Sequence, residues 1–136
     1  MDISRLIRNL TRIVGGPDEV PPMTATQRLA LFEVGDGGPL RLNDLADRMG
    51  VSAPTASRSV DALHDLGLVA RVPDPHDRRA LRIELTPAGE RLLTARKAKA
   101  QAAFAPAVAA LSDAERATLS RLLRRMTEAL RESRPG

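Results

Sequence analysis

The chain has 136 residues and a formal net charge of +4, with no cysteine, two histidines and two aromatic side chains, both Phe. This length fits a single domain with its own hydrophobic core, and the positive charge favours a polyanionic partner. The absence of cysteine excludes disulfides, thiolate nucleophiles and cysteine-based redox sensing, and the two unclustered histidines, His64 and His76, argue against a metal site.

The first fourteen residues carry apolar side chains at helical spacing. The stripe consists of Ile3, Leu6, Ile7, Leu10, Ile13 and Val14. Arg5, Arg8 and Arg12 fall on the opposite side, which predicts an amphipathic helix over residues 2–14. Arginines interrupt the apolar residues, unlike in a signal peptide, and the longest apolar run, residues 102–111, is too short to span a bilayer. We therefore expect a cytoplasmic protein with no membrane partner.

A second helix is predicted after a proline-rich loop. Thr24-Ala25-Thr26-Gln27 has the pattern of a capping box. The apolar positions of this helix are Leu29, Leu31, Phe32 and Val34. The short segment Leu40-Arg41-Leu42 is then expected to form a strand that pairs with a later hairpin.

The residues from 42 to 50 predict a short helix followed by a turn. Its apolar stripe is formed by Leu42, Leu45, Ala46 and Met49. Gly50 is expected to end the helix. Its start lacks a good cap, since Arg41 cannot accept a hydrogen bond, and Asn43 is an alternative cap.

A second helix follows the turn, so the segment has the pattern of a helix-turn-helix. Ser52 can cap this helix, and Ala56, Val60 and Leu63 share one face, which must be buried. The other faces carry small, hydroxylated or basic residues near the start of the helix. They are Pro54, Thr55, Ser57 and Arg58.

These residues suit a helix whose first turns enter the major groove of DNA. Small residues permit close approach, and Arg58 can read the O6 and N7 atoms of guanine. A simpler interpretation is that Arg58 is solvated, that Thr55 and Ser57 are ordinary surface residues, and that Ser52 is only a cap.

A β-hairpin is predicted directly after this helix. Gly67 can end the helix, residues 68–72 have strand character, and residues 81–85 alternate between apolar and charged side chains. The intervening tip carries Arg78 and Arg79, which could contact phosphates or pair with Asp74 and Asp77. From Arg41 to Arg82 there are seven arginines and six aspartates, so the placement of the arginines says more about DNA binding than the net charge does.

Two more helices are predicted after the hairpin. Thr86-Pro87 is a typical helix start, and Pro106 is expected to kink or end the helix that follows. Ser112 to Glu115 forms a capping box before a final amphipathic helix with an apolar stripe. The stripe consists of Leu119, Leu122, Leu123, Met126 and Leu130.

The terminal helices have apolar stripes and no sheet to cover them. Packing against each other and against a second copy would bury both stripes. We therefore expect a symmetric dimer. The expected interface residues are Ile3, Leu6, Leu10, Leu119, Leu123 and Met126.

Several segments together resemble the MarR family of winged-helix transcriptional regulators. They are Leu45-Ala46, Pro54-Thr55-Ala56-Ser57-Arg58, Leu63 with Gly67-Leu68-Val69, Asp77-Arg78-Arg79, and Leu85-Thr86-Pro87-Ala88-Gly89. The resemblance implies a mainly α fold with a small β-hairpin wing. It also implies one domain over residues 1–136, with a winged helix-turn-helix at about 40–86 and dimerisation helices at about 2–14 and 87–132.

The resemblance also implies roles for single residues. The recognition helix would enter the major groove of double-stranded DNA, Arg79 the minor groove, Arg78 would contact a phosphate, and Asp77 would hold the wing tip. The expected function is a repressor that binds a palindromic operator as a homodimer. A small anionic or phenolic effector would bind near Arg12 and His64, although a role as an ordinary surface residue fits each of them better.

Other classes of function have less support in the sequence. An enzyme would need a nucleophile with its base, a metal cluster, a cofactor site or a phosphate-binding loop, and no catalytic constellation of this kind is present. A winged-helix adaptor for protein partners is the main alternative. The PadR family has a similar motif after its wing, but its winged helix usually lies near the N-terminus, whereas about 40 residues precede it here.

Overall fold

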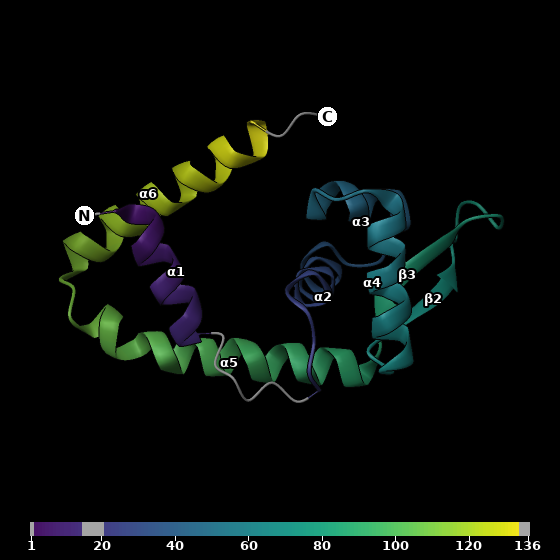
Figure 1. Cartoon of the computed structure of the whole chain (residues 1–136), viewed down its shortest axis with the longest axis horizontal. Coiled ribbons are helices and arrows are strands. Elements are labelled where there is room, and N and C mark those ends of the chain that lie inside the picture. Colours follow the sequence, from purple (N-terminus) through teal and green to yellow (C-terminus); the bar gives the residue numbers. More distant parts are fainter. Residues whose placement is uncertain (1, 15–20, 134–136) are drawn as a thin grey trace. The chain divides into compact units, whose positions relative to one another are not determined.

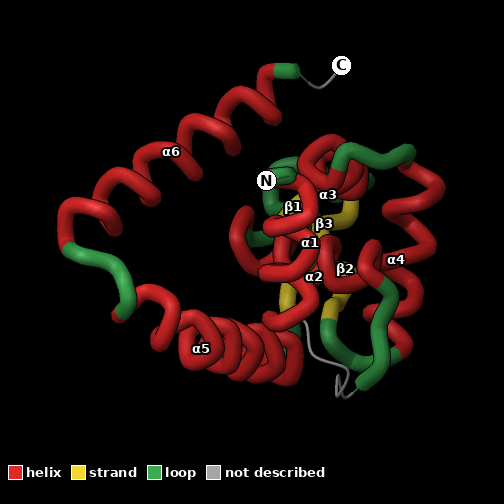
Figure 2. Tube along the Cα trace, turned by 60° about the vertical axis from the view of Figure 1, so that its left-hand side comes forward, coloured by secondary structure: helices red, strands yellow, loops and turns green. Residues whose placement is uncertain are grey.

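The computed structural model describes residues 2–14 and 21–133, apart from the side chains of residues 11–14. The chain divides into two compact units, one formed by residues 15–98 and the other by residues 1–14 with 99–136. The described residues form six helices and three short strands. Figures 1 and 2 show how these elements follow one another along the chain. The fold is therefore mainly α with a small sheet, as the sequence predicts.

The larger unit contains a helix-turn-helix. The unit consists of α2 (Ala25–Gly37), β1 (Leu40–Arg41), α3 (Leu42–Met49), α4 (Ala53–Asp65), β2 (Val69–Pro73), β3 (Leu81–Leu85) and the first part of α5 (Pro87–Ala109). Helices α3 and α4 form the helix-turn-helix. Gly50 ends α3 in the left-handed conformation at φ 69°, and Ser52 caps α4 by accepting a hydrogen bond from Thr55 N. The turn signals in the sequence are confirmed.

The core of this unit forms where α2 packs against α3 and α4. Each helix contributes side chains at helical spacing, and the sheet adds apolar residues from one face. The apolar residues that are least exposed are Ala30, Leu31, Val34, Leu45, Ala46, Met49, Ala56, Val60, Leu63, Val69 and Ile83. The buried face predicted for α4 is confirmed, and Ser59 is buried with it.

The three strands form an antiparallel sheet in the order β1-β3-β2. Leu40 and Arg41 pair with Ile83 and Arg82, which confirms the predicted short strand. The pairing of β2 with β3 runs to Pro73 opposite Leu81. Because successive residues of a strand point to opposite faces, Ile83 lies in the core while Arg82 lies on the outer face.

The interpretation of α2 is wrong in one respect. Leu29 is 37% exposed and Phe32 is 46% exposed, whereas Ala30, Leu31 and Val34 are buried. The buried residues follow the i, i+1, i+4 spacing of one helix face, and Leu29 and Phe32 fall outside it. The capping box is confirmed, since Thr24 and Gln27 exchange hydrogen bonds at 3.0 and 3.1 Å.

Two predicted boundaries also differ. Arg41 occupies the N-cap position of α3 without a side-chain cap, so Asn43 is not the cap. Helix α5 runs through Pro106 and ends at Ala109, less than one turn later. Because Pro106 lacks an N–H, one hydrogen bond of the helix is missing there, and α5 continues for only three more residues.

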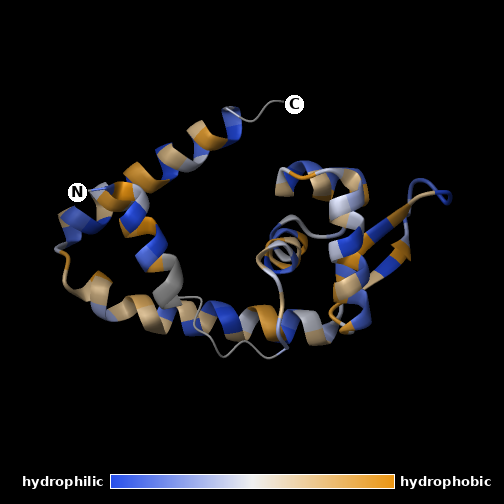
Figure 3. Ribbon diagram, viewed as in Figure 1, coloured by the Kyte–Doolittle hydropathy of each residue, from blue (hydrophilic) through white to orange (hydrophobic). Residues whose placement is uncertain are grey.

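The smaller unit contains α1 (Ile3–Val14), the last part of α5 and α6 (Asp113–Glu132). Ser112 caps α6, and Glu115 completes the predicted capping box. Hydrophobic residues recur along α6 between hydrophilic ones (Figure 3). No described helix is long and apolar enough to cross a membrane.

Candidate nucleic-acid interface

Three side chains at the start of α4 form a chain of hydrogen bonds. Ser52 Oγ donates to Thr55 Oγ1 at 3.0 Å, and Arg58 Nη2 donates to the same oxygen at 3.3 Å. Ser52 Oγ also accepts a hydrogen bond from Thr55 N at 3.3 Å. Ser52 is therefore a cap, and it is also linked to Arg58 through Thr55.

The hydrogen bonds determine where the remaining donors of this group point. Thr55 Oγ1 accepts two hydrogen bonds, so its own proton is directed away from Ser52 and Arg58. Arg58 is exposed and uses one of its five N–H donors on Thr55. Pro54 is exposed and Ser57 is half-buried on the same helix. The start of α4 can thus offer donors to acceptor groups on DNA.

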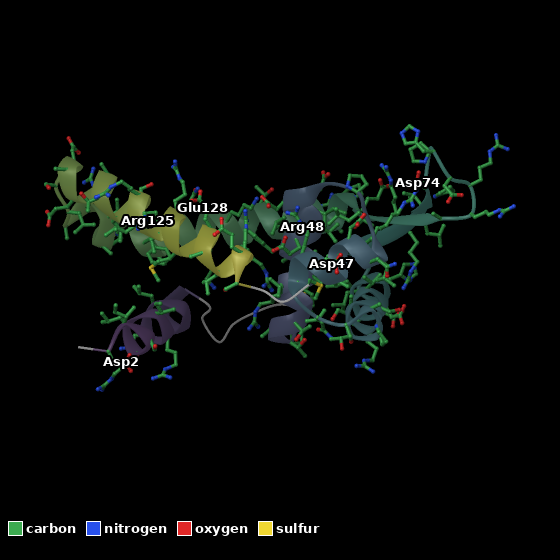
Figure 4. All side chains as sticks on the ribbon, turned by 90° about the horizontal axis from the view of Figure 1, so that it is seen from above. Asp2, Asp47, Arg48, Asp74, Arg125 and Glu128 are labelled. Carbon is green, nitrogen blue, oxygen red and sulfur yellow. The ribbon has the colours of Figure 1, made fainter. Side chains whose placement is uncertain are left out.

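The wing tip is built around Asp74, which directly follows β2 (Figure 4). Its side chain is 0% exposed, and its Oδ2 accepts Arg41 Nε at 2.9 Å and Arg82 Nε at 3.0 Å. Its Oδ1 accepts the backbone N–H groups of His76 at 2.8 Å and Asp77 at 3.2 Å. Four donors from β1, β3 and the tip therefore converge on one carboxylate.

These contacts also explain the charge state of Asp74. The backbone N–H of His76 is the largest influence that lowers the pKa of Asp74, and the hydrogen bond from Arg41 comes next. The same hydrogen bond raises the pKa of Arg41 above its ordinary value. Asp74 is therefore an anion under all ordinary conditions.

The other residues of the tip are exposed, including Arg78 and Arg79. Asp77 Oδ1 accepts a hydrogen bond from Arg79 N at 3.0 Å. Among the described residues, neither Arg78 nor Arg79 forms an ion pair, since Asp74 is paired with Arg41 and Arg82 instead. The guanidinium groups of the tip are thus available to an external anion.

Further contacts hold the wing and α5 to the recognition helix. Asp61 of α4 forms an ion pair with Arg71 of β2. Thr86 Oγ1 donates to the Gly67 carbonyl at 2.6 Å and accepts Gly89 N at 3.1 Å, as expected for the cap of α5. The ion pair joins α4 to β2, and the hydrogen bonds of Thr86 join the turn after α4 to the start of α5.

An ion-pair group links α2 with α3 in the same unit. Arg48 Nε lies 3.0 Å from Glu33 Oε2, and Arg48 Nη2 lies 3.0 Å from Asp36 Oδ2. Arg48 also packs over Gly37, where a Cβ atom would lie 3.0 Å from Arg48 Cζ. The first helix of the helix-turn-helix is therefore held by charged groups as well as by its apolar face.

The grouping of Asp74, Arg41 and Arg82 is not predicted from the sequence. Their positions in sequence are 33 and 8 residues apart, so no local periodicity connects them. One available signal was the Asp-Pro pair at the start of the tip, since an aspartate in a turn often accepts N–H groups two or three residues later.

Of the two candidate effector residues, only His64 has a described side chain. The side chain of Arg12 lies outside the described residues, and His64 is exposed on α4. The described residues contain no group of His, Cys, Asp or Glu that could hold a metal ion.

The residues predicted to form a dimer interface lie on exposed apolar faces of α1 and α6. They are Ile3, Leu6 and Leu10 on α1, and Leu119, Leu123 and Met126 on α6. Leu122 and Leu130 extend the face of α6. Helix α6 has no buried residue.

A helix-turn-helix followed by a β-hairpin wing, with exposed arginines on the helix start and on the wing tip, defines a winged-helix DNA-binding protein. The model of the MarR family matches residues 22–80. The transcriptional repressor NicR of Pseudomonas putida is 32% identical over 79% of this chain and 68% of its own length. The chain belongs to the MarR family and is a DNA-binding transcriptional regulator.

Solved structures agree with this assignment. RV1404 from Mycobacterium tuberculosis is 30% identical, with a TM-score of 0.77 over 98% of this chain and 88% of the other. BpsR from Bordetella bronchiseptica, whose DNA binding is regulated by 6-hydroxynicotinic acid, is 28% identical, with a TM-score of 0.65 over 93% of both chains. Transcriptional regulators of this family are not enzymes, as the sequence predicts for this chain.

Proposed function

We propose that this protein is a repressor that binds a palindromic operator as a homodimer and leaves it when a small anionic or phenolic effector binds. The observation that carries the proposal is the presence of exposed arginines at two places, Arg58 on α4 and Arg78 with Arg79 on the wing tip. Arg58 would read a base edge in the major groove, and Arg79 would enter the minor groove.

Other residues would assist these contacts. Ser52, Pro54, Thr55 and Ser57 would lie against the major groove, and Arg78 would contact a phosphate. Asp77 would hold the tip through its hydrogen bond from Arg79 N. Repression is supported by NicR, which is a repressor. A regulator of this kind acts on the chromosome, which supports the expected cytoplasmic location.

The exposed apolar faces of α1 and α6 support a homodimer. Burial of a fully exposed leucine side chain contributes about 1.5–3 kcal/mol, so burial of Leu123, which is 52% exposed, would stabilise a dimer by roughly half of this. A second copy would bury the same faces of both chains about a two-fold axis. Two recognition helices related in this way meet half-sites about 34–36 Å apart, so the operator would be an imperfect palindrome.

An aromatic side chain with a cation supports an effector of the proposed class. Lys97 Nζ lies 5.9 Å from the centre of the Phe32 ring, and this ring is half exposed. An aromatic carboxylate could stack on the ring and pair with the ammonium group. The regulation of BpsR by 6-hydroxynicotinic acid makes this compound the first probe. Arg12 and His64 remain further candidate ligands.

The test is a fluorescence-anisotropy titration against the DNA that flanks the protein's own gene and against a shuffled duplex, at several salt concentrations. We expect about a 10³-fold or greater preference for the native DNA, with affinity falling steeply as salt rises. Addition of 6-hydroxynicotinic acid should lower the affinity for that DNA. Equal, weak binding to both duplexes would contradict the proposal and favour an adaptor for protein partners.

A further inference from the structure

The tip of the wing has one buried polar anchor. Residues 75–79 are exposed, whereas the preceding Asp74 is buried. Within the tip, Asp74 N donates to the Ala80 carbonyl and Ala80 N donates to the Asp77 carbonyl, both at 3.0 Å. The Asp74 carboxylate adds the two bonds from His76 N and Asp77 N. Apolar packing therefore contributes little to the shape of this turn.

Asp74 also joins the turn to the sheet. Arg41 and Arg82 are direct partners in the pairing of β1 with β3, and like charges in opposed positions destabilise a sheet. Both place Nε on the same carboxylate oxygen, so Asp74 offsets this repulsion. The strand that precedes α3, the central strand and the tip thus meet at one side chain.

We propose that Asp74 is a positioning residue for DNA binding, because it fixes the turn that presents Arg78 and Arg79. This inference rests on the proposed contacts of these arginines with DNA. Because the tip is already ordered in the free protein, it loses less conformational entropy when it binds DNA. The Asp74 carboxylate is buried and already accepts four hydrogen bonds, so it acts on DNA binding through Arg78 and Arg79 without touching DNA.

The substitution Asp74→Asn tests this through the sign of its effect. An amide has one acceptor oxygen and one N–H₂ group, so in either orientation it places donors against donors, facing either the two arginines or the two backbone N–H groups. At the same time, the loss of a negative charge favours DNA binding in general. If Asp74 positions the tip, D74N should bind DNA more weakly than the wild type. If only its charge matters, D74N should bind DNA more tightly.

The matched control is Asp65→Asn, which removes the same charge from an exposed residue at the end of α4. Affinities are measured by anisotropy on a duplex that the wild-type protein selects from a random-sequence library. We expect D74N to lower the affinity about tenfold, as for a charged hydrogen-bond partner, and D65N to leave it unchanged or slightly higher. Affinity of D74N equal to that of D65N overturns the proposal.

A double-mutant cycle shows whether Asp74 acts through the tip. In an R78A/R79A background, D74N should change the affinity less than about twofold, while in an R58A background its effect should remain about tenfold. An equal loss in both backgrounds overturns the inference about Asp74 alone. If R78A/R79A itself binds like the wild type, the proposed tip contacts fail as well.

Amide hydrogen exchange on the wild-type protein gives a test that needs no variant to fold. His76 and Asp77 are exposed residues in an irregular turn, and their N–H groups are protected from exchange only while they donate to the Asp74 carboxylate. We expect both to exchange at least about tenfold more slowly than an unstructured peptide. Exchange at the unprotected rate would show that Asp74 does not fix the tip, and would overturn the proposal.

Discussion

Arg58 Nη2 donates a hydrogen bond to Thr55 Oγ1, 3.3 Å away and one turn earlier on α4. Ser52 Oγ donates to the same oxygen from the other side. The guanidinium is therefore held close to the helix start before any DNA is present. A long, flexible side chain that is ordered in advance loses less entropy on binding, which favours selective recognition of one base step.

The first prediction concerns Thr55→Val, which keeps the shape of the side chain and removes its oxygen. Because Thr55 Oγ1 accepts the hydrogen bonds of both Ser52 and Arg58, we expect the affinity for the selected duplex to fall by at least about three- to tenfold, the effect of one lost hydrogen bond. Binding to a shuffled duplex should be unchanged, since phosphate contacts carry no sequence information. Anisotropy titrations on both duplexes measure the difference.

Thr55→Ser is the control for this prediction, because it retains the hydroxyl group. It should bind the selected duplex like the wild type. If T55S and T55V lose the same affinity, the methyl group matters and the hydrogen bond to Arg58 does not.

A second prediction follows from the close approach of α5 to the turn after α4. A Cβ atom at Gly89 would lie 2.1 Å from the Leu68 carbonyl oxygen, so Gly89→Ala requires the backbone to shift. We expect the free energy of unfolding to fall by about 1–3 kcal/mol, as for an overpacked site. Urea denaturation followed by circular dichroism measures it.

Gly35→Ala provides a matched comparison, since it is also a glycine inside a helix. Its Cβ would lie 2.2 Å from the end of the Leu93 side chain, which can rotate, and alanine has a higher helix propensity than glycine by about 1 kcal/mol. G35A should therefore destabilise the protein less than G89A. The reverse order would mean that Leu93 is held more rigidly than the Leu68 backbone.

The third prediction concerns the stability of the protein at acid pH. Hydrogen bonds hold the pKa of Asp74 well below its ordinary value of about 4. A carboxylate whose folded-state pKa is lowered stabilises the fold fully above the unfolded pKa, and this stabilisation is lost as pH falls toward the folded pKa. The stability advantage of wild type over D74N should thus be constant near neutrality and shrink below about pH 4.

Urea denaturation of both proteins from pH 7 to pH 3 checks this relationship. D65N serves again as the control, and its difference from the wild type should vary much less with pH. An advantage over D74N that stays the same down to pH 3 would contradict the assignment of the depressed pKa to Asp74.

Local signals in the sequence predict most of the winged helix. Ser52, Gly50 and Thr86 act within one turn of their own positions, so each boundary they mark can be predicted without knowledge of the fold. The exposure of Phe32 could not be predicted in this way, because its helix also offers Leu31 and Val34 to the core. Which face is buried depends on the packing of α2 against α3 and α4.

The contacts of Asp74 with Arg41 and Arg82 can be predicted only when the register of the sheet is known. Arg41 belongs to a strand of two residues, and its distance from Asp74 is set by the pairing of β1 with β3. No pattern in the sequence specifies this pairing residue by residue. The tip arginines are visible in the sequence, whereas the residue that holds their turn is found only from the contacts.

The final prediction concerns the apolar face of α6. Leu123→Asp places a charge in the middle of the proposed dimer interface. Because the dimer has two-fold symmetry, one such charge from each subunit would be buried. Ala117→Asp introduces the same charge away from the apolar face, about 120° around the helix from Leu123 and about 160° from Leu119 at about 100° per residue. Analytical ultracentrifugation at micromolar concentration should give a dimer for wild type and A117D, and a monomer for L123D. L123D should also bind a palindromic duplex much more weakly, with its affinity for a single half-site unchanged. A wild-type protein that sediments as a monomer would mean that α1 and α6 cover their apolar faces without a second copy.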